Sequence, residues 1–158
     1  MLHELPAGSV TSPAGFSAGA THAGVKYPEP DRLDVGLLVS ERPCVASGLF
    51  TRSTVPGAPV VVSREHLRNR QARAIVTNSG VANLAMGEQG LRDAREMAAC
   101  AGSKLGVPPE DVVVASTGVI GWRRPIDRVK AGIERIAPGP DGGLDLARAI
   151  MTMDTRPK

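Results

Sequence analysis

One amphipathic helix between two apolar runs constrains the fold of this chain more than any other sequence feature. Apolar residues recur at three- and four-residue steps across Glu88–Lys104, which predicts a helix with one buried face. An acidic residue at its start and Gly106 after its end are typical helix boundaries. The apolar runs Ala72–Thr77 and Val112–Ala115 each predict a buried strand. We therefore expect a strand–helix–strand crossover unit, whose strand direction the sequence does not determine.

The rest of the chain alternates apolar segments with turn-forming residues. We expect strands over Gly15–Ala20, Leu33–Ser40, Cys44–Thr51 and Val60–Val62, and helices over Pro125–Ile136 and Leu144–Met151. The shorter expected features are a connection at Glu41–Pro43, a helical turn over Arg64–Asn69 capped by Ser63, and a surface loop over Lys26–Arg32. This alternation predicts the α/β fold class.

The composition fits one globular domain. With 158 residues, of which 42% are hydrophobic, the chain is long enough to bury a core. We expect a single domain over residues 1–158, with residues 1–14 as a flexible arm, because the start of the chain is rich in Gly, Ala, Ser and Pro. Only 3% of the residues are aromatic, so the core must be built from aliphatic side chains and methionine.

Charge and cysteine patterns argue against several classes of function. The formal net charge is +3, but no run of Lys and Arg is long enough to indicate nucleic-acid binding. No segment approaches the ~20 apolar residues that a membrane helix needs, and the start of the chain lacks a signal-peptide pattern. Cys44 and Cys100 form no CxxC pair and have no ligand spacing with the histidines, so we expect no metal site and no cofactor. Reduced cysteines suit a cytoplasmic protein.

The segment Val112–Gly121, VVVASTGVIG, carries candidate chemistry at the end of a predicted strand. Thr117 supplies a hydroxyl, and Gly118 supplies a backbone N–H that a ligand can approach closely. Two such donors can stabilise a developing oxyanion. On the residues alone, an ordinary turn with a Ser/Thr bond to the backbone remains an alternative. The Gly- and Asn-rich loop Asn78–Gly90 is likewise either a ligand-binding loop or turn chemistry alone.

Four segments together resemble the ornithine acetyltransferase family, the ArgJ-type glutamate N-acetyltransferases of arginine biosynthesis. In family order they are RAIVTNSGVANLAMGEQG, LRDAREMA, VVVASTGVIG and AIMTMDTRPK. The resemblance runs from about Ala14 to Lys158. The motifs of the third and fourth segments, ASTGVIG and AIMT-x-DT-x-PK, are specific in combination. The resemblance implies a layered sandwich of mixed β-sheet and helices, completed by a second (β) chain of the same precursor.

The resemblance also implies a reaction. A precursor of this family cuts itself into α and β chains, and the new N-terminal Thr of the β chain takes acetyl from N-acetylornithine and passes it to glutamate. Some members also accept acetyl-CoA as donor. The free α-amine of such a nucleophile can act as the base for its own hydroxyl. By resemblance, this sequence is most of an α chain, is inactive without the β chain, and joins an α2β2 heterotetramer.

Site residues follow from the same resemblance, position by position. Thr117 and Gly118 match the family's oxyanion donors, and Thr152 matches a threonine that contacts substrate. Asn78 and Ser79 match a signature loop without an assigned chemical role. The chain departs from the family pattern in two residues, since Val81 replaces a polar residue and Met153 stands where a second Thr is common.

The nucleophilic Thr is absent from this sequence, which leaves two alternatives to the acetyltransferase hypothesis. One is a self-cleaving amidohydrolase or aminopeptidase subunit, in which water accepts the acyl group. The other is a non-catalytic assembly subunit that keeps the fold without the nucleophile. The oxyanion argument applies to both enzymes, and only the acceptor differs between them.

Overall fold

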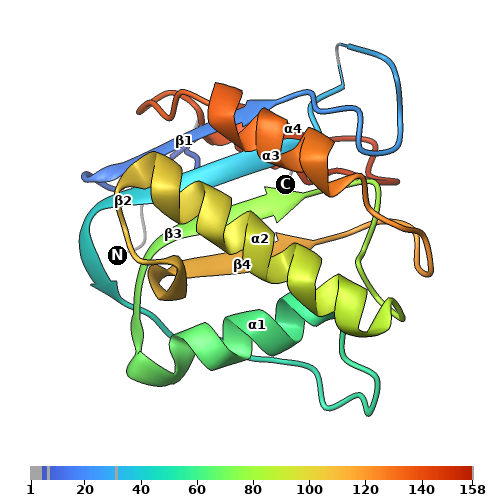
Figure 1. The fold of residues 1–158 in the computed structure, drawn as a ribbon. Coiled ribbons are helices and arrows are strands. Elements are labelled where there is room, and N and C mark those ends of the chain that lie inside the picture. The colour runs from blue at the N-terminus through green and yellow to red at the C-terminus, as the bar shows by residue number, and fades with distance from the viewer. Residues whose placement is uncertain (1–4, 7, 31, 158) are drawn as a thin grey trace.

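The computed structural model describes residues 5–6, 8–30 and 32–157, and its centre is a mixed four-stranded β-sheet (Figure 1). The strands lie in chain order, as β1 (Phe16–Thr21), β2 (Val35–Val45), β3 (Gln71–Asn78) and β4 (Val112–Ser116). β1 and β2 pair antiparallel, as do β2 and β3, whereas β3 and β4 are parallel. The predicted α/β class is confirmed, and the strand direction that the sequence left open is parallel.

Four α-helices surround this sheet. They are α1 (Ala58–His66), α2 (Gly87–Leu105), α3 (Ile126–Arg135) and α4 (Gly143–Ala149), and two short 3-10 helices lie at Leu67–Asn69 and Pro109–Asp111. α2 and α3 lie across one face of the sheet, and α1 lies beside α2 along the β4 edge (Figure 1). α2 forms the crossover between the parallel strands β3 and β4, as the amphipathic pattern predicts.

The core lies between the sheet and these three helices and is aliphatic, as the composition predicts. Leu37 of β2, Met97 of α2 and Ile133 of α3 are fully buried there, together with Val76 and Val112 from the two parallel strands. The alternation of side chains along each strand explains this pattern, because every second residue points toward the helices. Burial of such large side chains is the main term that holds the layers together.

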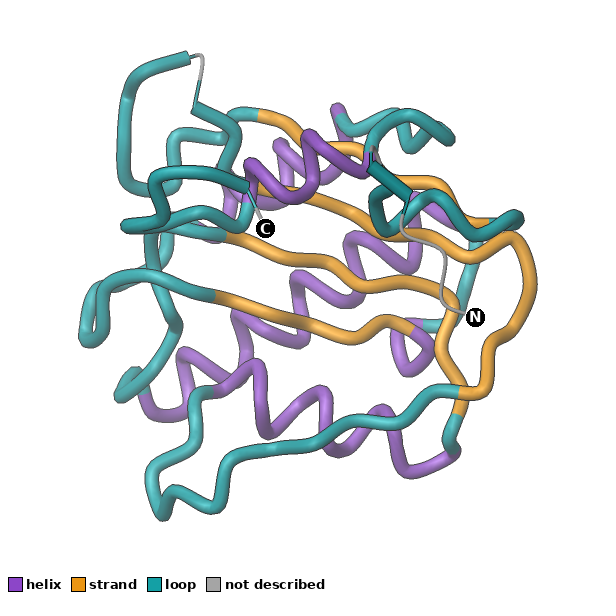
Figure 2. The backbone as a smooth tube through the Cα atoms, turned by 180° about the vertical axis from the view of Figure 1, so that it is seen from behind, coloured by secondary structure: helices purple, strands orange, loops and turns teal. Residues whose placement is uncertain are grey.

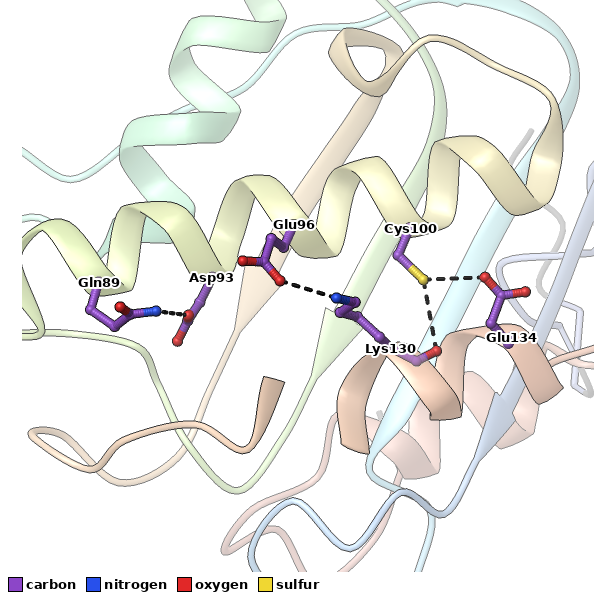
Figure 3. A network of polar contacts seen from close by, with 6 residues as sticks. All are labelled: Gln89, Asp93, Glu96, Cys100, Lys130 and Glu134. Atoms are coloured by element: carbon purple, nitrogen blue, oxygen red, sulfur yellow. Dashed lines mark hydrogen bonds and ion pairs between the residues drawn. The ribbon is translucent and has the colours of Figure 1, made fainter. Parts of the chain in front are cut away.

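Polar contacts join α2 and α3 along their outer seam (Figure 3). Lys130 Nζ lies 3.2 Å from Glu96 Oε2. The Cys100 thiol donates to the Lys130 carbonyl at 3.7 Å and to Glu134 Oε1 at 3.4 Å. Burial, followed by the hydrogen bond to Glu134, raises the pKa of Cys100 to about 11. Exposed ion pairs of this kind add little to stability, so the apolar contacts beneath them hold the two helices.

α4 packs on the opposite face of the sheet. A Cβ at Gly132 of α3 would meet Val35, whereas a Cβ at Gly36 would meet Leu146 of α4. Because neighbouring residues of a strand point to opposite faces, α3 and α4 lie on opposite sides of β2. Seen from behind, α4 crosses in front of the upper strands and the lower strands are uncovered by helices (Figure 2).

The face that α4 leaves uncovered carries an apolar row. Leu38, Ile75 and Val113 are register partners on β2, β3 and β4. They alternate with the buried core residues and therefore point away from α1–α3. Ile75 is 39% exposed, and the other two side chains are half-buried.

Several predicted elements are confirmed and two predicted strands are wrong. The strands expected near Gly15–Ala20, Ala72–Thr77 and Val112–Ala115 are present as β1, β3 and β4. The strand pair predicted over Leu33–Ser40 and Cys44–Thr51 is instead one long strand, β2, which ends at Val45. The polar residues Glu41–Pro43, predicted to connect the two strands, lie inside β2. The register between β2 and β3 shifts at this point, between Val39 and Cys44.

The strand predicted at Val60–Val62 is wrong, because these residues lie within α1. Ser63 therefore does not cap a helix, since it sits inside α1 and is buried. The turn predicted over Arg64–Asn69 splits between the end of α1 and the following 3-10 helix. Pro59 occupies the first turn of α1, where its fixed φ favours helix.

Residues 1–4 and 7 of the predicted N-terminal arm lie outside the described residues. In the described part of the arm, turns form at Gly8, which donates to the Leu5 carbonyl, and at Ser12, which donates to the Ser9 carbonyl. Ser9 also lies against the start of α4, where it would contact a Cβ placed on Gly143. The flexibility of the arm stays a prediction.

Candidate active site

Asn78 connects the carboxyl ends of the parallel strands β3 and β4. It is fully buried, and its carbonyl accepts a hydrogen bond from Thr117 N–H at 3.0 Å. Its side-chain amide donates to the carbonyls of Ser79 at 3.1 Å and Val81 at 3.0 Å. The Ser116 hydroxyl donates to Asn78 Oδ1 at 2.7 Å. One asparagine thus fixes both loops that leave the strands at the edge where α/β proteins commonly bind ligands.

Gly118 packs directly against the loop that follows β3. A Cβ at Gly118 would overlap the Gly80 carbonyl group and the Val81 nitrogen, and the residue has φ +130°. Val119 N–H donates to the Gly80 carbonyl at 3.0 Å, which closes this contact on its other side. Only glycine satisfies both the close approach and the backbone angle. The glycine predicted here from the sequence is therefore required by the backbone.

A cavity of about 290 Å³ opens at this point and brings together all three predicted site residues. Its lining residues are Lys26, Tyr27, Arg32, Gly80, Thr117, Gly118, Val119, Thr152 and Met153. Within the described ranges, no residue accepts a hydrogen bond from Gly118 N–H or from the Thr117 hydroxyl. Two adjacent donors thus remain available to a ligand in the cavity.

Thr152 reaches the cavity from the other end of the chain. It follows α4, and its carbonyl accepts a hydrogen bond from Arg32 Nη2 at 3.1 Å. Met153 beside it is 94% exposed. The segment after α4 therefore depends on the segment before β2 for its position at the cavity.

Two cations line the cavity that the sequence did not indicate as site residues. Lys26 and Arg32 lie in the segment predicted as a surface loop, and Tyr27 lies between them. Lys26 Nζ is 4.7 Å and Arg32 Cζ is 4.0 Å from the centre of the Tyr27 ring, within the range of cation–π contacts. Hydrogen bonding to Lys26 lowers the pKa of the Tyr27 hydroxyl below its ordinary value.

Buried Asp34 holds this loop against the site. Its carboxylate accepts hydrogen bonds from Ala23 N–H at 2.6 Å and Val25 N–H at 2.7 Å. Its carbonyl accepts from Ser79 N–H at 2.9 Å, which ties the start of β2 to the loop after β3. In the sequence, the one indication of these contacts is that acidic Asp34 lies within the apolar run Leu33–Ser40.

Val81, which departs from the family pattern, belongs to the core rather than to the cavity. It is 1% exposed and pairs with Val119 in a parallel bridge. Asn83, two residues later, is also buried and donates from Nδ2 to the Gly90 carbonyl at 2.9 Å, at the start of α2. The side chains of Asn78 and Asn83 therefore hold the backbone of the loop Asn78–Gly90. Gly80 in this loop is the glycine that contacts Gly118.

Over residues 5–6, 8–30 and 32–157, no three His, Cys, Asp or Glu side chains gather in a way that could hold a metal ion. Within the same described ranges, no helix combines the length and the apolar character needed to cross a membrane.

The geometry can be compared with known proteins. The model of the ArgJ family matches residues 17–158, which is most of the chain. The chain belongs to the ArgJ family. Among ArgJ proteins, the arginine biosynthesis bifunctional protein ArgJ of Dehalococcoides mccartyi is 47% identical over 154 residues, covering 98% of this chain and 38% of that relative. The ArgJ protein of Bacillus subtilis is 40% identical over 149 residues, covering 94% of this chain and 36% of the relative.

Two solved ArgJ structures share the fold. The crystal structure of the arginine biosynthesis bifunctional protein argJ from Bacillus halodurans superposes with a TM-score of 0.88 at 38% identity, covering 94% of this chain and 78% of that chain. An ornithine acetyltransferase from Mycobacterium tuberculosis, solved in complex with ornithine, gives a TM-score of 0.87 at 37% identity, covering 96% and 82%. The chain thus spans less than two fifths of the two curated relatives above and most of each solved chain.

Proposed function

We propose that this chain is the α-chain portion of a glutamate N-acetyltransferase, which transfers acetyl from N-acetylornithine to glutamate in arginine biosynthesis. The observation that carries the proposal is the cavity, because it gathers Thr117, Gly118 and Thr152 from segments far apart in the sequence. ArgJ-family membership supports the reaction class. The ornithine bound to the Mycobacterium tuberculosis relative supports the substrate class.

In this reaction the described residues stabilise charge and do not attack. The nucleophilic Thr lies on the β chain, where its own α-amine can accept its proton. Its attack on the acetyl carbonyl develops a negative oxygen, to which the Thr117 hydroxyl and Gly118 N–H donate. The same pair serves again when glutamate attacks the acetyl-enzyme. Loss of one such donor typically costs about 10²–10³ in kcat.

The cavity's charge suits substrates that carry a carboxylate. Lys26 and Arg32 both line it, and N-acetylornithine and glutamate are both amino-acid carboxylates. Thr152, whose carbonyl accepts a hydrogen bond from Arg32 Nη2 at 3.1 Å, is proposed to contact substrate beside these cations. Some members of the family accept acetyl-CoA as a donor, but no feature of this cavity favours that donor.

Completion by a β chain is supported by two independent observations. The chain covers 38% of the Dehalococcoides mccartyi relative but 82% of the solved Mycobacterium tuberculosis chain, as expected if relatives are cut into two chains. The row of Leu38, Ile75 and Val113 leaves an apolar sheet face open that a second chain would cover. We propose one domain over residues 1–158, assembled with the β chain as an α2β2 heterotetramer in the cytoplasm, where the free thiols Cys44 and Cys100 stay reduced.

The test is a transfer assay on this chain assembled with the β-chain portion of the same protein. Labelled N-acetylornithine and unlabelled glutamate are expected to give labelled N-acetylglutamate. Release of labelled acetate that does not depend on glutamate would instead identify a hydrolase. No labelled product of either kind from an assembled complex would leave the non-catalytic subunit as the surviving hypothesis.

A further inference from the structure

Arg124 is a buried cation immediately behind the candidate site. It is 2% exposed, although its neighbours Trp122 and Arg123 are exposed. Its Nη1 atom donates to Met97 Sδ on α2 at 3.3 Å. Burial lowers the pKa of Arg124 to about 10, and the nearby Asp93 carboxylate opposes this shift. The guanidinium therefore stays charged at neutral pH although it is buried.

The same nitrogen joins the carboxyl ends of the two parallel strands. Arg124 Nη1 donates to Asn78 Oδ1 at the end of β3 and to Ser116 Oγ at the end of β4, each at 3.0 Å. Both acceptors adjoin the proposed oxyanion donors. Ser116 directly precedes Thr117, and the Asn78 carbonyl accepts the Thr117 N–H.

The fold itself gains little from this arginine. Its Nε and Nη2 atoms are buried, and neither has a hydrogen-bond partner in the described part of the chain. Buried charged groups with unpartnered donors lower stability. Asn78 Oδ1 does not need the guanidinium, because it also accepts from the Ser116 hydroxyl. A side chain that costs stability in this way is often retained for a role at a functional site.

We propose that Arg124 is a positioning residue for the oxyanion donors, holding the ends of β3 and β4 at the separation that Thr117 and Gly118 require. The proposal rests on the proposed function for the identity of those donors. It concerns residues in this chain only, and it assigns Arg124 no contact with substrate.

The test compares three variants of the assembled protein. Arg124→Met keeps the side-chain length and removes the donors, so kcat should fall about 10- to 100-fold because small displacements of catalytic groups are costly. KM should stay within about twofold, since substrate contacts are untouched. Arg124→Lys keeps a buried donor and should recover part of the loss. Met97→Leu removes the third acceptor of the same nitrogen without touching the strand ends, and should leave kcat unchanged.

Amide hydrogen exchange separates positioning from a structural role. The melting temperature of Arg124→Met should fall, because buried Asp93 loses its nearby cation, and this fall is expected for either role. Amide hydrogen exchange should rise selectively at Thr117 and Val119, whose N–H groups bond to the carbonyls of Asn78 at the end of β3 and of Gly80 in the loop after it. An unchanged kcat, or exchange raised throughout the chain rather than at these two residues, would overturn the proposal. If the unaltered protein transfers no acetyl, the proposed function fails, and the exchange measurement still decides the role of Arg124.

Discussion

Gly118 shows how one residue can fix the geometry of a site. Gly118→Ala would place a Cβ against the Gly80 carbonyl group, so the two loops must separate. We expect transfer activity to fall by about 100-fold, because the Thr117 hydroxyl and the residue-118 N–H move apart. Gly121→Ala is the matched control, since Gly121 also has positive φ, +74°, but has open space around its Cβ position. Equal activity in the two variants would contradict this reading of the contact.

A second prediction at this scale concerns the thiol of Cys100. Its pKa is raised to about 11 by burial and by the hydrogen bond to Glu134. Since the thiolate is the nucleophile, alkylation by iodoacetamide should be slow at pH 8 and should accelerate as the pH rises toward 11. Glu134→Gln should raise the rate at pH 8, because it removes a negative charge that disfavours the thiolate. A rate that levels off below pH 9 would show that the thiol is not held in its neutral form.

Some residues of the candidate site could be predicted from the sequence and others could not. Thr117, Gly118 and Thr152 could be predicted from motifs, and the cavity joins them. Lys26 and Arg32 could not, because their loop contacts segments far along the chain, such as Thr152, whose carbonyl bonds to Arg32. Local patterns carry no information on such long-range contacts.

At the scale of elements, α1 protects the outer edge of β4. The Ser63 hydroxyl donates to the Val114 carbonyl at 2.7 Å and accepts from Val114 N–H at 2.9 Å. His66 Nδ1 donates to the Val112 carbonyl at 2.7 Å. Unpaired strand edges promote aggregation, and these side chains satisfy the edge in place of another strand.

Ser63→Ala should therefore destabilise the chain. Both backbone groups of Val114 would lose their buried partner, at about 1–3 kcal/mol for each unsatisfied group. Urea unfolding of the assembled protein should show the loss as a lower midpoint, with a greater tendency to aggregate. Ser103→Ala, on the exposed side of α2, is the matched control and should be neutral. An unchanged urea midpoint for Ser63→Ala would mean that water replaces the hydroxyl at the edge of β4.

The same helix explains the main error in the predicted elements. Val60–Val62 has the β-branched composition of a strand, yet it forms the middle of α1. β-Propensity is weaker than tertiary packing, and here α1 packs against β4 and buries Val62. Pro59 in the first turn favours a helix, whereas three consecutive valines favour a strand. The sequence alone does not show which of these two preferences prevails. The helix over Glu88–Lys104 was predictable because its periodicity extends over several turns.

At the scale of the whole molecule, the open face of the sheet is the surface on which we propose that the second chain docks. Ile75 lies at the centre of the row formed with Leu38 and Val113. Ile75→Lys should block assembly with the β-chain portion, because it places a charge in an apolar interface. Ala131→Lys, on the exposed side of α3, should assemble normally. Size-exclusion chromatography of the co-expressed chains measures both, and normal assembly of Ile75→Lys would show that the second chain does not cover this face.

Thr117 is proposed to donate its hydroxyl to the oxyanion, and two substitutions separate this role from the shape of the side chain. Thr117→Ser keeps the hydroxyl, and Thr117→Val keeps the shape without it. This role predicts that Thr117→Val lowers kcat for acetyl transfer by about 10²–10³ with little change in KM, whereas Thr117→Ser stays close to the unaltered protein. A Thr117→Val variant with the full kcat would contradict it.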